Sequence, residues 1–247
     1  MAISSREIKG YDKGATGETP ILIDLLLKYN ENLAKEQMRE ADALYLGRRN
    51  LSQKMLSLIA LSVSLALGDR DSLSSHFKLA KKYNVERNEI IDIIKISKLV
   101  LMSSTMYGCK ECLLIIKENA RLDYKKEEID KIIKKVRKDI NTGLIPENFI
   151  ALSEFSFDLL TEHLKEKGEL LSPMKLDMRT TYLIAFSVAQ SIKYKECMRI
   201  YLKQFFGNGG TIGELEDAIS TVRYVTGNRV MNSAVEILKD LDSLKED

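Results

Sequence analysis

The sequence predicts an all-α protein that contains two tandem copies of one helical repeat, related by a pseudo-twofold axis. First, turn signals are few, because only 3 residues are Pro and 13 are Gly among 247. Second, hydrophobic residues make up 45% of the chain and charged residues 30%, as is usual for a globular helical protein. Third, a helical stretch that starts at residue 51 recurs at residue 176, which is 125 positions later.

The internal repeat is clearest where LSQKMLSLIALSVSLA (51–66) aligns with LDMRTTYLIAFSVAQS (176–191). Six of the sixteen positions are identical, whereas unrelated stretches share about one. The identities fall at Leu51, Leu58, Ile59, Ala60, Ser62 and Val63. The alignment continues without a gap, so that Asp92 meets Asp217. We interpret this pattern as a tandem duplication.

The duplication divides the chain into four segments. Residues 1–18 carry several glycines and are expected to form a flexible N-terminal arm, followed by a first repeat over 19–123 and a second over 145–247. Residues 124–144 are expected to form a basic amphipathic connecting helix with its aliphatic stripe on the protein body. Binding of its basic face to a membrane or an acidic partner is the alternative.

Each repeat is expected to contain a series of helices. In the first repeat, one helix should open at Thr19-Pro20 and run through residue 46. The next helix should begin after Ser52, or after Asp177 in the second repeat, and be buried on all sides. A third helix holds SLSSHFKLAKKY or KECMRIYLKQFF. The fourth opens at VERNEII or TIGELED, where Thr211 and Glu214 have the spacing of a capping box.

The order of key residues along these helices is also informative. The first copy has LIALSVSLA, then His76, Ala80, Asn84 and Asn88-Glu89-Ile90, and the second has LIAFSVA, then Tyr201, Phe205, Gly209-Gly210-Thr211 and Glu214-Leu215. The repeat unit therefore resembles the carboxymuconolactone decarboxylase family, which includes the alkylhydroperoxidase-like (AhpD-like) proteins. The resemblance covers nearly the whole chain twice and implies an AhpD-like helical fold.

The resemblance implies two kinds of chemistry. The peroxidase branch of the family uses Cys-x-x-Cys-x-x-x-His, and the cysteine positions here hold Asp69 and Ser72 in the first copy, Tyr194 and Cys197 in the second. Neither copy is complete. In the decarboxylase branch a polar, acidic stretch precedes the histidine, as GDRDSLSSH does here. The resemblance therefore favours a lyase in which His76 transfers a proton on a small carboxylated or lactone substrate.

The spacing of residues around His76 is compatible with general acid–base catalysis. Asp69, Ser72 and His76 occupy positions i, i+3 and i+7, so they are expected on one helix face that orients the imidazole. Arg48, Arg49 or Lys54 is expected to neutralise the substrate carboxylates, and residues of the second repeat to complete the site. The alternative is a histidine with a structural role.

A rival reading places thiol chemistry at Cys197, one helical turn before Tyr201. Basic neighbours at Lys193, Lys195 and Arg199 could lower the pKa of the thiol and support peroxiredoxin-type peroxidase activity. A buried apolar role for Cys197 is the more common outcome. A third hypothesis is a divergent oligomeric scaffold protein that has lost its catalytic residues.

Two other features look functional but are explained more simply. Cys109 and Cys112 form a Cys-x-x-Cys pair, yet the repeat aligns them with the inside of the final helix and favours packing over a reversible disulfide. His163 is expected to be an exposed residue near a helix C-terminus.

Composition limits the partners and the location. The net charge of +2 gives no reason to expect nucleic acid, and the apolar runs look too short to span a membrane. Three cysteines and no signal-like start favour the cytoplasm. We expect a small-molecule substrate, no cofactor or metal, and a homo-oligomer, either a trimer or a dimer of two-repeat chains.

Overall fold

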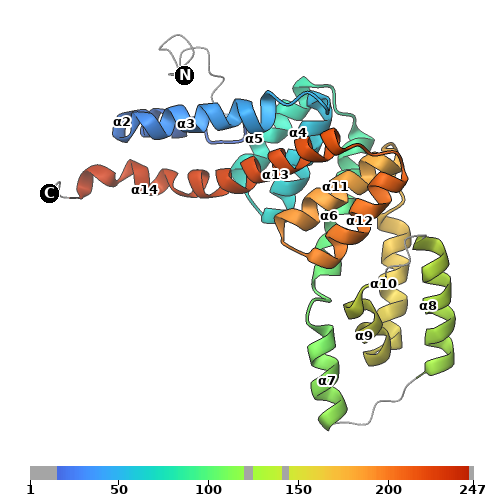
Figure 1. Ribbon diagram of the computed structural model, residues 1–247. Helices are drawn as coiled ribbons and strands as arrows, with labels where there is room; N and C mark the ends of the chain where they lie inside the picture. The colour runs from blue at the N-terminus through green and yellow to red at the C-terminus, as the bar shows by residue number, and fades with distance from the viewer. Residues whose placement is uncertain (1–15, 120–124, 141–144, 245–247) are drawn as a thin grey trace. The chain divides into compact units, whose positions relative to one another are not determined.

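The computed structural model describes residues 16–119, 125–140 and 145–244. These residues form helices joined by turns, without a strand among them, so the all-α prediction is confirmed (Figure 1). They group into two compact units. Of the described residues, the first unit contains 16–90 and 211–244, and the second contains those between 91 and 210. The units therefore do not coincide with the two sequence repeats.

The first unit takes its helices from both ends of the chain. They are α2 (Leu22–Tyr29), α3 (Glu31–Ala41), the π-helical turn η1 (Asp42–Leu46), α4 (Gln53–Leu67), α5 (Arg70–Lys82), α13 (Ile212–Ser233), α14 (Val235–Lys239) and the short 3-10 turn η2 (Leu241–Ser243). Helix α6 (Arg87–Ser104) begins in this unit and continues into the second.

The predicted continuous helix from Thr19 to residue 46 is wrong in two places. The helix begins only at Leu22, and it breaks at Asn30. The Asn30 side chain accepts a hydrogen bond from the N–H of Leu33 and so caps α3. An Asn side chain that competes for backbone groups ends one helix and starts the next.

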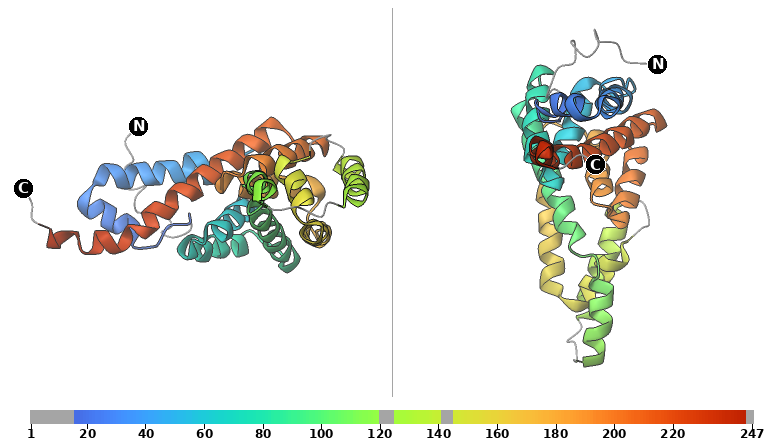
Figure 2. Two further views of the ribbon diagram at one scale, coloured as in Figure 1. Left: turned by 90° about the horizontal axis from the view of Figure 1, so that it is seen from below. Right: turned by 90° about the vertical axis from the view of Figure 1, so that its left-hand side faces the viewer.

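Helix α4 forms the centre of the first unit, as predicted. Every residue from Leu56 to Ser64 is buried, and α5 and α13 pack against it. The Ser52 side chain caps its start by accepting from the N–H of Met55. A second apolar cluster joins α2 and α3 to the C-terminal helices, which lie side by side in both views of Figure 2. Its buried members are Leu22, Ile23, Leu26, Ala34, Met38 and Val235.

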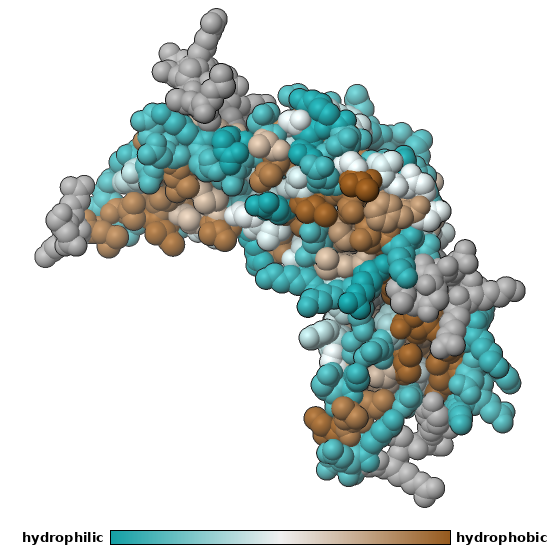
Figure 3. Space-filling model, viewed as in Figure 1, coloured by the Kyte–Doolittle hydropathy of each residue, from teal (hydrophilic) through white to brown (hydrophobic). Residues whose placement is uncertain are grey.

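The second unit contains most of α6 and the helices α7 (Cys109–Asn119), α8 (Lys126–Ile140), α9 (Glu147–Phe155), α10 (Phe157–Leu170), α11 (Met178–Ser191) and α12 (Lys195–Gly207). The connecting helix behaves as predicted, because Val136 of α8 packs with Phe149 and Leu160. Its lysines at 126, 131, 134 and 135 are exposed, and Figure 3 shows a hydrophilic surface over α8.

Local geometry recurs at the spacing of the sequence repeat. Helix α5 spans residues 70–82 and α12 spans 195–207, which is the same range displaced by 125. Asn84 and Gly209, also 125 apart, both have positive φ, of 56° and 83°. The capping box at Thr211 and Glu214 is present. A tandem duplication predicts such correspondences.

The turn η1 marks one difference between the repeats. From the cap Asn30 to the cap Ser52 there are 22 positions, whereas from the cap Ser156 to the cap Asp177 there are 21. The extra residue falls in the stretch that contains the π-helical turn, which is the wider turn that accommodates an additional residue.

The expectation that no segment could span a membrane needs correction. Within the described residues one stretch, Arg87–Asn119, is long and apolar enough by length and composition. It comprises α6, a break at residues 105–108, and α7. A core helix of a water-soluble protein passes the same test.

Candidate functional site

The helix α5 carries His76 into the interior of the first unit. The imidazole is fully buried, and Nδ1 lies 3.3 Å from the hydroxyl of Tyr45 on η1. The Tyr45 ring meets the imidazole edge to face and stacks on Tyr224 of α13, with centroids 5.7 Å apart. Tyr224, a residue of the second repeat, is therefore separated from His76 by the Tyr45 ring.

Burial determines the protonation state of the ring. It lowers the pKa of His76 to about 4, although the charge of Asp69 opposes the shift. The ring is therefore neutral at pH 7. Its second nitrogen, Nε2, is buried without a hydrogen-bond partner.

Asp69 and Ser72 hold the start of α5 rather than the ring. Asp69 is the N-cap, and it accepts hydrogen bonds from the backbone N–H of Ser72 at 3.2 Å and from its hydroxyl at 2.5 Å. Asn232 of α13 donates to the Ser72 hydroxyl at 2.9 Å. Ser72 and His76 both lie on the buried side of α5, whereas Asp69 precedes the helix as its cap and turns its side chain back to the first turn.

Residues 16–18 belong to the same buried cluster, so this part of the predicted flexible arm is not loose; residues 1–15 lie outside the described residues. Thr16, Gly17 and Glu18 are all buried. Each backbone carbonyl accepts from a side chain of the unit: that of residue 16 from Asn228, that of 17 from Asn232, and that of 18 from Ser75. In return, the N–H of Thr19 donates to Asn232 at 2.9 Å.

Gly17 lies directly against the imidazole. Its φ is +98°, and a Cβ at this position would be 2.3 Å from Nε2 of His76. Only glycine fits here, because the backbone conformation and the contact both exclude a side chain. The unpartnered nitrogen of His76 therefore faces this residue.

The carboxylate of Glu18 is also fully buried. It accepts hydrogen bonds from the hydroxyl of Tyr224 at 3.3 Å and from the hydroxyl of Thr16. Gln37 of α3 donates to Asn228 at 2.6 Å and lies 3.5 Å from the Tyr224 hydroxyl. The Glu18 carboxylate and the imidazole thus share one buried hydrogen-bonded cluster, which Asp69 joins through Ser72 and Asn232.

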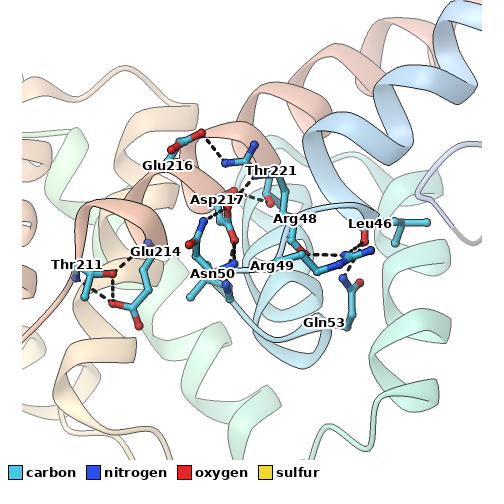
Figure 4. A network of polar contacts seen from close by, with 11 residues as sticks. Leu46, Arg48, Arg49, Asn50, Gln53, Thr211, Glu214, Glu216, Asp217 and Thr221 are labelled. Carbon is cyan, nitrogen blue, oxygen red and sulfur yellow. Dashed lines mark hydrogen bonds and ion pairs between the residues drawn. The ribbon is translucent and has the colours of Figure 1, made fainter. Parts of the chain in front are cut away.

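The cations expected at the site lie elsewhere. Arg48 donates to Asp217 and to Glu216, both at 2.7 Å (Figure 4). Lys54 pairs with Glu89 at 2.8 Å, and Arg49 donates to backbone carbonyls of residues 46 and 48. Each is engaged by a local acceptor, and their role beside a substrate stays a prediction.

The second unit contains the counterpart of the His76 cluster, position for position at the spacing of 125. Tyr201 stands for His76, Cys197 for Ser72, and Leu99 and Ser103 for Tyr224 and Asn228. A mostly apolar cavity of about 50 Å³ lies among these residues. Its lining is Leu99, Ser103, Met106, Val136, Pro146, Phe149, His163, Lys167, Tyr194, Cys197, Ile200 and Tyr201.

Cys197 is not an activated thiol. Burial raises its pKa to about 12, and the opposing effect of Lys167 and of hydrogen bonds with Tyr201 and Ser103 is smaller. The predicted lowering of the pKa by basic neighbours is therefore wrong, and the buried apolar role describes Cys197 better.

The other cysteines and His163 also differ from expectation. Cys109 is the first residue of α7, so the Cys-x-x-Cys pair lies in a first helical turn, and Cys112 is exposed rather than packed. Both thiols are free. His163 is not in a last turn, since α10 continues to residue 170; it packs near Phe149, and burial lowers its pKa to about 4.

Several residues of the cluster escaped the sequence analysis. Tyr224, Asn228 and Asn232 recur every fourth residue on the buried side of α13, which is a signal that the sequence does contain. Gly17, Glu18 and Tyr45 have no such pattern. Among the described residues, no group of three or more His, Cys, Asp or Glu side chains could hold a metal ion.

Comparisons with known proteins agree with this geometry. Residues 33–113 match the model of the carboxymuconolactone decarboxylase family. This segment belongs to that family. The carboxymuconolactone decarboxylase segment includes η1, α4, α5 and α6 and hence both Tyr45 and His76. The predicted resemblance to this family is thereby confirmed for residues 33–113.

One crystal structure shares the fold over almost the whole chain. It is a protein of Burkholderia xenovorans LB400 that is provisionally described as a gamma-carboxymuconolactone decarboxylase subunit. The TM-score is 0.76 at 16% sequence identity, with 93% of each chain covered. The likeness shows a common fold. The comparison with curated protein sequences gave no match.

Proposed function

We propose that the chain is a carboxymuconolactone-decarboxylase-like enzyme in which His76 transfers a proton on a small carboxylated or lactone substrate. The observation that supports this proposal most is the unpartnered Nε2 of a buried, neutral imidazole in a polar cluster. Buried polar atoms are almost always bonded, so this ring nitrogen has its hydrogen-bonding capacity available for a substrate. The corresponding cluster in the second unit has a phenol in place of the imidazole and mostly apolar walls.

The chemistry fits a decarboxylation. The bond between the substrate carbon and its carboxylate breaks, CO2 leaves, and the electron pair stays on the carbon. That carbon then takes one proton, which His76 delivers and which solvent replaces. A ring with a pKa near 4 is neutral at rest and a strong proton donor once protonated. The Tyr45 hydroxyl beside Nδ1 can donate or accept as the ring changes state.

The direct test is turnover of small lactone carboxylates, followed as CO2 release. We expect His76→Gln to lower kcat at least a hundredfold while His163→Gln, which changes the only other histidine in the sequence, keeps it. Equal turnover in His76→Gln and the natural protein would refute the role of His76. The chain would then be better described as an oligomeric scaffold.

We also propose a homo-oligomer, a trimer or a dimer of two-repeat chains. The helices α7 and α14 occupy corresponding places in the two repeats, and both expose aliphatic side chains: Leu114 and Ile115 on α7, Ile237 on α14. Brown surface lies along α14 in Figure 3. Light scattering should give a multiple of the chain mass, reduced by Ile115→Lys with Ile237→Lys. The cytoplasmic location stays a prediction.

A further inference from the structure

The carboxylate of Glu18 lies inside the buried cluster that contains Tyr45, Tyr224 and His76. The side chain is fully buried and accepts a hydrogen bond from the Tyr224 hydroxyl. The Tyr224 ring stacks on Tyr45, which meets the His76 imidazole edge to face. Thr16–Glu18 is held by hydrogen bonds from side chains of α5 and α13 to all three of its carbonyls. The cluster therefore holds a bent peptide segment and a carboxylate together.

Gly17 packs against the imidazole of His76 and leaves its Nε2 without a hydrogen-bond partner. It fills the space in front of Nε2 but offers the nitrogen no hydrogen bond. A glycine CH2 against a buried ring nitrogen leaves that nitrogen unsatisfied, which destabilises this arrangement. A ligand with a hydrogen-bonding group at this point would satisfy Nε2, so it would gain an interaction that residues 16–18 lack.

We infer that Glu18 occupies the subsite for the ligand carboxylate, with the Tyr224 hydroxyl as its selecting donor, and that a small dicarboxylate or lactone carboxylate competes with residues 16–18. The ligand class rests on the proposed function. Tyr224 is a specificity residue in this scheme, and Gly17–Glu18 is a built-in competitor. Neutral donors suffice for one buried carboxylate, as helix caps and Asx turns illustrate.

Binding of glutarate to the full chain tests the inference, by calorimetry and by hydrogen exchange of residues 16–19. We expect Glu18→Ala to bind glutarate about tenfold more tightly than the natural protein, because the competitor is removed. Glu36→Gln, an exposed substitution on α3, is the control and should not change the affinity. Adding Tyr224→Phe to Glu18→Ala should weaken binding about fivefold.

Hydrogen exchange supplies a second readout. Saturating glutarate should speed exchange of the Thr19 amide, which donates to Asn232 in the ligand-free arrangement. If Glu18→Ala unfolds, the nearly isosteric Glu18→Gln replaces it in the same comparison. Equal affinity in all variants, slower exchange at Thr19, or no binding by any variant would overturn the subsite. The His76→Gln turnover test is independent of these results, so the two proposals can fail separately.

Discussion

The carboxylate of Asp217 accepts a hydrogen bond from the backbone N–H of Leu51 at 2.9 Å, and so joins α13 to the loop that starts α4. The N–H of Asn50 donates to the same carboxylate at 2.7 Å (Figure 4). In the second unit, Asp92 accepts from the N–H groups of Lys175 and Leu176, which are the same positions displaced by 125. Each aspartate therefore accepts backbone hydrogen bonds from the loop of the other repeat.

This contact predicts a large loss of stability on removal of Asp217. The side chain is buried and pairs with Arg48, so Asp217→Ala should lower the free energy of unfolding by about 3–5 kcal/mol. Glu216→Gln is the matched control, because Glu216 is exposed and bonds the same arginine. Urea unfolding of both variants measures the difference, and equal midpoints would show that the network does not stabilise the unit.

Stability should also depend on pH through His76. In the unfolded chain the ring takes up a proton with a pKa near 6.5, whereas the folded ring stays neutral down to about pH 4. Unfolding therefore becomes easier as the pH falls from 6.5 to 4, by about 3 kcal/mol for a shift of this size. Above pH 6.5 the contribution is constant.

The control for this effect is the other histidine. His163 has a pKa near 4 as well, so His76→Gln should remove one part of the pH dependence and His163→Gln another. Unfolding curves at half-unit steps between pH 4 and 7 separate the two. A pH profile that His76→Gln leaves unchanged would mean that the folded ring is not held neutral.

The three thiols should differ in reactivity. Cys112 is exposed and should react first with a chromogenic disulfide reagent, followed by the partly buried Cys109. Cys197 should react only on unfolding, because burial raises its pKa to about 12. Cys112→Ser should remove the fast phase and Cys197→Ser should keep it. Loss of peroxide turnover in Cys197→Ser would instead revive the peroxidase reading.

Gly17→Ala should cost more stability than Gly209→Ala. Both glycines have positive φ, +98° and +83°, so both alanine variants carry backbone strain of about 1 kcal/mol. Only at Gly17 would the new Cβ meet the His76 ring; no atom lies within 4 Å at Gly209. Thermal unfolding compares the two variants. Equal losses would mean that residues 16–18 do not contact the ring.

The sequence predicted those features that local periodicity and composition control. The buried character of α4, the caps at Ser52 and Asp177, and the capping box at Thr211 follow from short patterns, and all are present. The break at Asn30 was missed because the apolar spacing continues across it and one polar residue decides the ending.

The site was only half predictable. His76 could be found because it is one of two histidines and because the resemblance to the decarboxylase family places it at that family's active position. Glu18 and Gly17 could not, since they approach His76 from a segment without periodic structure. The pKa of Cys197 was predicted in the wrong direction, because nearby basic residues in sequence say nothing about how deeply a thiol is buried.

The division of the chain into units at Ile90 and Thr211 has a consequence for fragments. A polypeptide that ends near residue 123 would contain α4 without α13 to cover it, and the complementary piece would hold α13 without α4. Neither half can bury its apolar residues alone. A mixture of the two halves, however, contains all the helices that pack against one another in the intact protein. Co-expressed halves should therefore reconstitute one another, whereas a half made alone should pair with itself or precipitate. Tethering the halves in one polypeptide makes folding a first-order event that is insensitive to dilution.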